Sequence, residues 1–280
     1  MSEPITNAIN TESGALQSQC NLLRSLHVPG RPLVLPNVWD AATARTVVAA
    51  GFPVVATTSA GVTATLGYED HERAPSEEMF LAAGRVAHSV DVPVTVDAEA
   101  GYGLSPAELV TTLKRIGAAG CNLEDTDHGS GTLRNADQQA DWLHSVREAA
   151  SKQQYGLIIN ARVDAFLHGL DKQPQADQLE QALTRANAYV EAGADCVYPI
   201  TLWERDALTS FMAEADGPVN ILATPRAPSI AELAELGVAR VSLAGLLYRG
   251  AMAWLQSTLA SLAREVQEAG APMRPAPSEK

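Results

Sequence analysis

The chain has 280 residues, of which 46% are hydrophobic and 19% are charged, and its formal net charge is −13. This composition is typical of a soluble globular protein, and the length suits one large domain or two small ones. The acidic balance and the lack of a basic stripe argue against a nucleic-acid partner. An acidic substrate would need a local metal ion or an arginine, because the overall charge repels it.

The three cysteines, Cys20, Cys121 and Cys196, are widely spaced and odd in number, so they indicate neither a disulfide framework nor a zinc site. We interpret Cys121 and Cys196 as small apolar residues in buried strands, and a reduced cytoplasmic setting fits. The N-terminus has no cationic start followed by an apolar run, so no signal peptide is predicted. No uncharged apolar run is long enough to span a bilayer, and no membrane partner is expected.

Short apolar segments rich in β-branched residues alternate with helix-like segments along most of the chain. A leading helix is expected at about 14–26 and a long final helix at about 247–268. The predicted strands are 33–40, 54–58, 92–98, 121–125, 156–164, 196–200, 218–223 and 240–245. The helices between them are predicted at 41–51, 76–90, 105–120, 136–152, 175–192, 203–215 and 229–237.

The predicted strands are near-continuous apolar runs, which is typical of a parallel sheet buried on both faces. Eight strand–helix pairs in this length favour a closed (β/α)8 TIM barrel, with an extra N-terminal helix and a long C-terminal helix. An open, doubly wound sheet is the alternative. We expect an N-terminal extension at 1–30, the barrel at 31–270 and a flexible tail at 271–280.

Active sites of this barrel lie at the carboxyl ends of its strands. Asp97 and Glu99 close the third strand two residues apart, so both face one side if the strand stays extended. Glu124 closes the fourth strand. Carboxylates that share one space repel unless they are protonated or bound to a cation, and oxygen ligands suit Mg²⁺ or Mn²⁺. The alternative is that these acids are solvated or cap the next helices.

Arg162 lies within the apolar fifth strand, and a buried arginine needs an anion. It could pair with Glu124 or Asp97, or it could hold a substrate carboxylate through two hydrogen bonds. The two roles are compatible, so both stay open.

Ser59, Ala60 and Gly61 directly follow the second strand. Small residues there let backbone N–H groups approach an anion, although a plain tight turn would look the same. The GYG segment at 101–103 predicts a flexible loop beside the acids. No nucleotide-binding glycine motif is present.

Four segments together resemble the isocitrate lyase/phosphoenolpyruvate mutase superfamily: TTSAGVTATLGYED (57–70), VDAEAGYG (96–103), NLED (122–125) and NARVDAF (160–166). The resemblance runs from about residue 30 to 255. It implies a (β/α)8 barrel that binds Mg²⁺ and a 2-oxo acid, and that makes or breaks a C–C or P–C bond. It also implies a homo-oligomer, a dimer or tetramer, in which neighbours exchange the last helix.

The resemblance also implies roles for matching residues. Asp97 is the implied chief metal ligand, Glu99 and Glu124 are implied ligands through water, and Asp70 is a further acid near the metal. On the substrate side the implied residues are Ser59, Ala60, Gly61, Arg162 and Asn220.

The loop after the fourth strand reads TDHGSGTLRNADQQ and departs from the best-known members. It has neither the cysteine loop of the isocitrate and methylisocitrate lyases nor the lysine-rich gating loop of the mutases. His128 in this loop and Tyr198 on the sixth strand are the candidate proton carriers, although a lone loop histidine is usually exposed.

These features predict a Mg²⁺-dependent lyase that cleaves a C–C bond of a small 2-oxo or 2-hydroxy acid through an enolate. One alternative is P–C mutase or hydrolase chemistry on phosphonopyruvate. The other is a barrel that binds a keto acid without catalysis.

Overall fold

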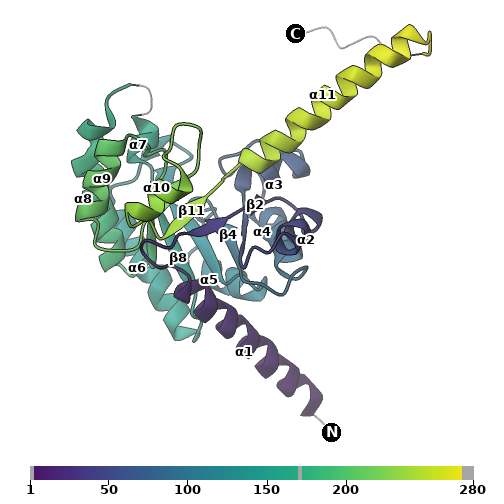
Figure 1. Cartoon of the computed structure of the whole chain (residues 1–280). Coiled ribbons are helices and arrows are strands. Elements are labelled where there is room, and N and C mark those ends of the chain that lie inside the picture. Colours follow the sequence, from purple (N-terminus) through teal and green to yellow (C-terminus); the bar gives the residue numbers. More distant parts are fainter. Residues whose placement is uncertain (1–2, 170–171, 273–280) are drawn as a thin grey trace.

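A computed structural model describes residues 3–169 and 172–272 of the chain, which fold as a ring of parallel strands surrounded by helices (Figure 1). The barrel strands are β1 (Leu33–Leu35), β2 (Asn37–Val38), β3 (Val55–Thr57), β4 (Val94–Asp97), β5 (Gly120–Glu124), β8 (Ile158–Val163), β9 (Cys196–Pro199), β10 (Asn220–Leu222) and β11 (Arg240–Ser242). A hairpin, β6 (Thr126–Asp127) and β7 (Thr132–Leu133), follows β5.

The strands close into a barrel. One sheet has the order β2-β3-β4-β5-β8-β9 and the other has the order β1-β11-β10. They join because β1 leads directly into β2 and because a parallel bridge between Val197 and Val219 links β9 to β10. The predicted (β/α)8 barrel is therefore confirmed.

The helices mostly follow the prediction, and the turn chemistry explains where two of them begin. Ser105 and Ser229 each accept a hydrogen bond from the backbone N–H three residues later, in reciprocal capping boxes. The helices are α1 (Glu3–Ser25), α2 (Ala41–Ala49), α3 (Ser59–Leu66), α4 (Ser76–Ala87), α5 (Pro106–Arg115), α6 (Ala136–Lys152), α7 (Ala165–His168), α8 (Leu179–Glu191, after a 3-10 turn at Gln175–Gln178), α9 (Arg205–Glu214), α10 (Ile230–Glu235) and α11 (Leu246–Glu268).

Helix α1 closes the amino-terminal end of the barrel with its last turns. Cys20 and Leu23 are fully buried in the core. A Cβ atom at Gly120, where β5 begins, would lie 2.9 Å from Leu23 Cδ2, so only glycine lets this helix approach the strand. The division into extension, barrel and tail stays a prediction, and residues 273–280 of the proposed tail lie outside the described part.

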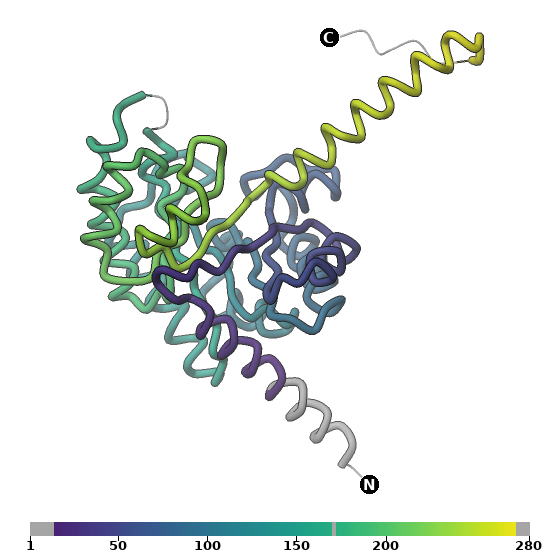
Figure 2. Tube along the Cα trace, in the orientation of Figure 1, coloured from purple at the N-terminus to yellow at the C-terminus, as the bar shows by residue number. Residues whose placement is uncertain are grey.

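The last helix extends away from the barrel (Figure 2). Helix α11 projects along its length and has no buried residue. None of the described helices is both long and apolar enough to cross a membrane. Cys20, Cys121 and Cys196 are free thiols and are buried, as small apolar residues would be.

Candidate active site

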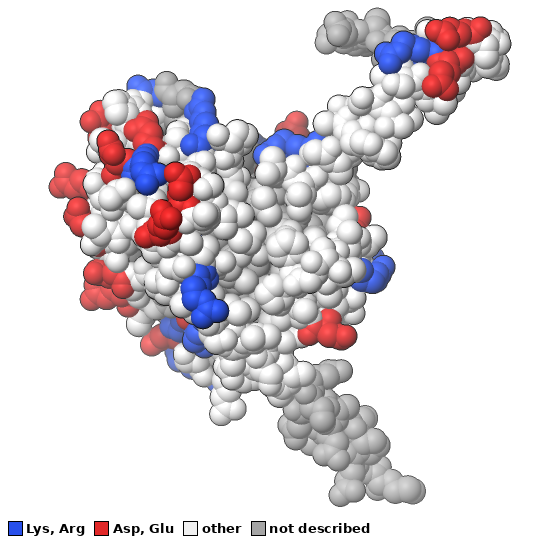
Figure 3. Space-filling view, in the orientation of Figure 1, with Lys and Arg blue, Asp and Glu red and all other residues white. Residues whose placement is uncertain are grey.

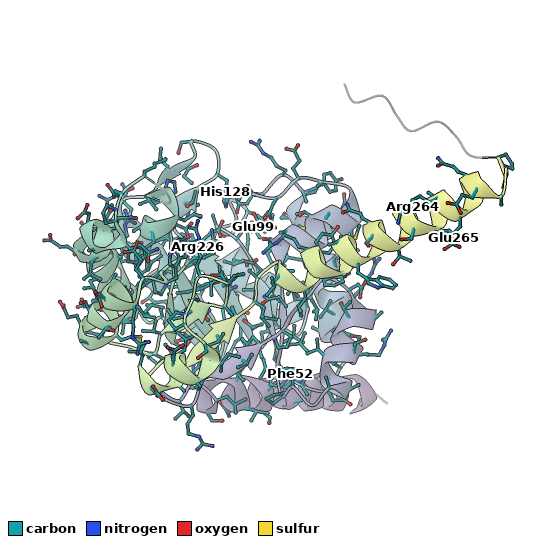
Figure 4. The ribbon with its side chains drawn as sticks, turned by 45° about the horizontal axis from the view of Figure 1, so that its top comes forward. Phe52, Glu99, His128, Arg226, Arg264 and Glu265 are labelled. Carbon is teal, nitrogen blue, oxygen red and sulfur yellow. The ribbon has the colours of Figure 1, made fainter. Side chains whose placement is uncertain are left out.

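The acids predicted at the strand ends gather at one rim of the barrel. They come from β4 and β5, which are neighbours in the sheet, and β5 also pairs with β8, which carries Arg162. Glu99 and His128 lie next to each other at this rim (Figure 4). Parallel strands bring their carboxyl ends to one edge, so the topology itself assembles this cluster.

Glu99, Glu124 and His128 form a set of possible metal ligands. One ligand atom from each lies within 4.8 Å of the other two. His128 Nε2 contacts a carboxylate oxygen of Glu124, and its side chain is only 8% exposed, so this loop histidine points into the site. Burial alone would lower the pKa of His128, but the hydrogen bond and charge of Glu124 raise it, with a further contribution from Glu99.

Asp97 and Asp70 offer two further carboxylates beside this set. Asp97 Oδ2 accepts a hydrogen bond from the backbone N–H of Ser59 at 3.0 Å. Its Oδ1, like Oδ1 of Asp70, is buried with no hydrogen-bond partner among the described residues. Burial first, and then the charge of Asp97, raises the pKa of Glu99 to about 8. Unpartnered carboxylate oxygens that repel one another are the arrangement that a bound cation would stabilise.

Glu99 reaches the cluster in a different way from the one predicted. Strand β4 ends at Asp97, and Glu99 has φ +45°, so the chain turns and does not stay extended. The turn continues through Gly101, which has φ +94° and whose Cβ would lie 2.8 Å from Trp142. It brings the hydroxyl of Tyr102 to donate a 2.7 Å hydrogen bond to Glu99. Tyr102 was not predicted as a site residue.

Arg162 takes the ion-pair role that was one of its two predicted alternatives. Its Nη1 contacts Glu124, and its Nε and Nη2 donate to Asp164 at 2.6 and 3.0 Å. Burial alone would lower the pKa of Arg162, but the charges of Asp164 and Glu124 raise it well above its usual value. The guanidinium is thus held between two carboxylates, and Asp97 makes no direct bond with it among the described contacts.

A buried network behind the site fixes Asp164. The carboxylate of Asp125 is fully buried and accepts from the backbone N–H of Asp164 at 2.8 Å. It also accepts from Arg185 at 2.9 Å and from the hydroxyl of Tyr189 at 2.7 Å, both on α8. In the sequence, the signal for this network is that Arg185 lies on the apolar face of a helix. Its partner Asp125 lies 60 residues away and could not be identified from residue spacing.

Residues 59–61 form the first turn of α3 and not a simple turn. The first N–H groups of a helix have no carbonyl partner inside it and can bind an anion, and the cradle role of these residues stays a prediction. However, the backbone N–H of Ser59 donates to Asp97. The backbone N–H groups of Ala60 and Gly61 therefore remain to bind an anion. Gly61 also has a packing role, because its Cβ would lie 3.0 Å from Trp39.

Tyr198 and Asn220 lie inside the barrel. The hydroxyl of Tyr198 is buried without a partner among the described residues, and burial raises its pKa. Asn220 is fully buried, and its amide hydrogen-bonds with the hydroxyl of Ser242 at 2.9 Å. Their predicted roles in catalysis and substrate binding stay predictions.

A pocket of about 380 Å³ opens beside the acids. His128 and Arg162 form its inner side, and none of the described residues that line it is acidic. The size suits a small organic acid. The basic residues around it are His71, Arg73, His128, Arg162, His168 and Lys172.

Comparison with known proteins agrees with this architecture. The family model of phosphoenolpyruvate phosphomutase matches residues 23–263. The phosphoenolpyruvate phosphomutase of Streptomyces hygroscopicus is 29% identical over 260 residues, covering 88% of this chain and 80% of that protein. The 2-methylisocitrate lyase of Aeropyrum pernix is 27% identical over 257 residues, covering 89% of this chain and 80% of that protein.

Solved structures give the same result. A candidate phosphonomutase of Burkholderia cenocepacia is 39% identical and superposes with a TM-score of 0.80, covering 88% of this chain and 99% of that one. The barrel, the acidic rim and the family match agree. The chain belongs to the phosphoenolpyruvate phosphomutase family and is an enzyme of the isocitrate lyase/phosphoenolpyruvate mutase superfamily.

Proposed function

We propose that the protein is a Mg²⁺-dependent lyase that cleaves a C–C bond of a small 2-oxo or 2-hydroxy carboxylic acid. The observation that carries this proposal is the buried group of Glu99, Glu124 and His128 beside Asp97, at the edge of a pocket. The similarity to a protein named 2-methylisocitrate lyase supports the C–C reaction.

The donor set fits a hard divalent cation. Asp97 would bind it directly through its unpartnered Oδ1, and Glu99, Glu124 and Asp70 would complete the site directly or through water. Mn²⁺ suits the same oxygen ligands. A bound divalent cation supplies positive charge that stabilises an enolate.

The chain's own residues would position the substrate and move a proton. The free N–H groups of Ala60 and Gly61 would hold one carboxylate at the start of α3. Arg162 lines the pocket and orients Glu124 through their ion pair. We place His128 as the proton carrier in preference to Tyr198, because only His128 lines the pocket.

P–C chemistry on phosphonopyruvate is the second candidate, and the similarity to a phosphoenolpyruvate phosphomutase favours it. A keto-acid-binding barrel without catalysis is the third. Its support is the loop at 126–139, which has no cysteine to act as an acid.

A substrate panel separates the three candidates. The purified protein with Mg²⁺ is mixed with 2-oxo and 2-hydroxy diacids and with phosphonopyruvate. We expect keto-acid release from at least one diacid, and loss of that release on removing metal with EDTA. Conversion of phosphonopyruvate seen by ³¹P NMR would favour the second candidate, and binding without turnover across the panel would favour the third.

We also propose that the protein is a homo-oligomer, a dimer or tetramer, built on α11. The surface of α11 has few charged residues except near the C-terminal end of the helix (Figure 3). Seven large apolar side chains on this helix are exposed, and Trp254 is 69% exposed. A patch of this size on a soluble protein indicates a partner surface, here a second copy of the chain. The seven are Leu246, Leu247, Met252, Trp254, Leu255, Leu259 and Leu262.

Trp254→Glu is expected to shift the protein from an oligomer to a monomer, because the charge would have to be buried between copies. Size-exclusion chromatography with light scattering measures the mass. Leu81→Glu is the matched control, since Leu81 is also an exposed apolar residue, on α4, at 55% exposure. A Trp254→Glu variant that keeps the wild-type mass would contradict the role of α11.

A further inference from the structure

Two loops at the acidic rim contain non-glycine residues in the left-handed backbone region. In the loop between α3 and α4, His71 has φ +69° and Glu72 has φ +56°. In the turn after β4, Glu99 has φ +45° and Tyr102 has φ +54°. Such conformations cost free energy in a residue with a side chain, and they persist where surrounding contacts hold them. The two loops therefore need contacts that keep them in this shape.

Three hydrogen bonds among Glu72, Glu99 and Tyr102 supply these contacts, and we call them the Glu72 clasp. The backbone N–H of Glu72 donates to Oε2 of Glu99 at 2.5 Å. The carboxylate of Glu72 in turn accepts from the backbone N–H of Tyr102 at 2.5 Å. The hydroxyl of Tyr102 donates to Oε1 of Glu99 at 2.7 Å. The clasp thus ties the two loops together, and both carboxylate oxygens of Glu99 accept a hydrogen bond from it.

The clasp holds the loop between α3 and α4 over the acids. Asp70, two residues before Glu72, has a buried Oδ1 atom. His71 lines the pocket, and its ring lies 5.2 Å from the ring of His128. Glu72 itself neither lines the pocket nor belongs to the set of possible metal ligands. Its contacts are with the turn after β4, so it can affect the metal site through Glu99 and through the loop that carries Asp70.

The clasp also fixes how Glu99 faces a cation. Glu99, Glu124 and His128 each offer one ligand atom to the same small space. A carboxylate held at both oxygens cannot turn to offer its second oxygen without breaking a hydrogen bond of the clasp. Mg²⁺ demands near-ideal octahedral geometry and keeps several waters, so a fixed carboxylate suits it. Ca²⁺ is larger and takes more oxygen ligands, often both oxygens of one carboxylate, so the clasp disfavours it.

We propose that Glu72 and Tyr102 are positioning residues that hold the Glu99 carboxylate and thereby make the site select Mg²⁺ over Ca²⁺. This inference rests on the proposed function, which supplies the Mg²⁺ site. Both residues act through Glu99 and take no part in breaking the substrate bond. Without the clasp, Glu99 is free to turn toward the ion, and the larger cation gains relative to the smaller one.

The test measures dissociation constants of Mg²⁺ and Ca²⁺ by calorimetry on the whole chain. Tyr102→Phe keeps the ring, which packs edge-on against Phe80 at 5.6 Å, and loses only the hydroxyl bond to Glu99. We expect the ratio of the Ca²⁺ constant to the Mg²⁺ constant to fall about fivefold, the usual effect of losing one hydrogen bond. Glu72→Ala removes the acceptor for Tyr102 N–H and is expected to lower the same ratio.

Tyr68→Phe is the matched control, because the Tyr68 hydroxyl donates a similar 2.9 Å hydrogen bond to Glu78 on α4, outside the clasp. It is expected to keep the wild-type ratio.

The outcomes separate the clasp from the metal site. If wild type binds Mg²⁺ and either clasp variant keeps the wild-type ratio, that residue does not set the selectivity, whereas the metal site stands. Equal weakening of both ions would mean a merely structural role and would also contradict the inference. A wild-type protein that binds neither cation would remove the metal site of the proposed function, and the selectivity with it.

Discussion

Asp97→Asn is expected to lower kcat/KM for the 2-oxo acid substrate about 1000-fold, or about 4 kcal/mol, and to weaken Mg²⁺ binding at least about tenfold. Asparagine keeps the volume of the side chain and an oxygen that can accept from Ser59 N–H. The substitution removes the negative charge of the side chain. It also replaces the oxygen that would bind the cation with an amide nitrogen. Calorimetry with Mg²⁺ and the keto-acid assay measure the two effects.

The same substitution is expected to leave the fold intact. Asp97 and Glu99 repel each other in the absence of metal, so Asp97→Asn should unfold at the same or a higher temperature than wild type without Mg²⁺. Asp127→Asn is the control, since Asp127 is an exposed acid whose bonds to Gly129 and Ser130 N–H asparagine can also make. Unchanged Mg²⁺ affinity in Asp97→Asn would remove the basis of the metal site.

The order of strands and helices could be predicted because each element carries its own local signal. Helix α6 has the predicted bounds, since its apolar spacing is regular and Asn135 caps it. Helix α3 was missed because its residues, SAGVTATL, have no polar face and follow a strand directly. Pro36 separates β1 from β2, where one strand was predicted, because proline cannot donate a hydrogen bond to a neighbouring strand.

The acids of the site could be predicted because strand ends share one rim, but their partners could not. The orientation of His128 depends on a hairpin, and the ion pair of Arg162 with Asp164 depends on how the chain bends after β8. Tyr102 reaches Glu99 only because the backbone enters the left-handed region. Such contacts depend on backbone angles that residue spacing does not determine.

A buried arginine inside the barrel was also unpredicted, and it affects stability. Arg240 on β11 is fully buried, and among the described residues only its Nη2 finds a partner, Asn122 at 3.1 Å. His27, just after α1, is 9% exposed and hydrogen-bonds the backbone oxygen of Leu23 through Nδ1 at 2.8 Å. Burial first, and then the charge of Arg240, lowers the pKa of His27 from 6.5 to about 4. Arg24 lowers it further, whereas the bond to Leu23 and the charge of Asp195 act in the opposite direction.

This lowered pKa predicts a loss of stability in acid. The unfolded chain takes up the proton near pH 6.5 and the folded protein only near pH 4, so folding is favoured above pH 6.5 and weakens as the pH falls. The difference between the two pKa values, at about 1.4 kcal/mol per unit, corresponds to a loss of about 3 kcal/mol in the free energy of unfolding between pH 6.5 and 4. His27→Asn keeps a donor for Leu23 and does not titrate, so its unfolding free energy should fall about 3 kcal/mol less over this range.

Urea unfolding of wild type and variant at each pH measures the difference, because groups that titrate equally in both proteins cancel. His88→Asn controls for the loss of the imidazole bond alone, since His88 bonds the oxygen of Gly84 at 2.8 Å in the same geometry from an exposed position. Parallel pH profiles for wild type and His27→Asn would mean that the folded protein protonates His27 freely. The barrel would then have to open around Arg240 in mild acid, because a second cation cannot otherwise be accommodated beside it.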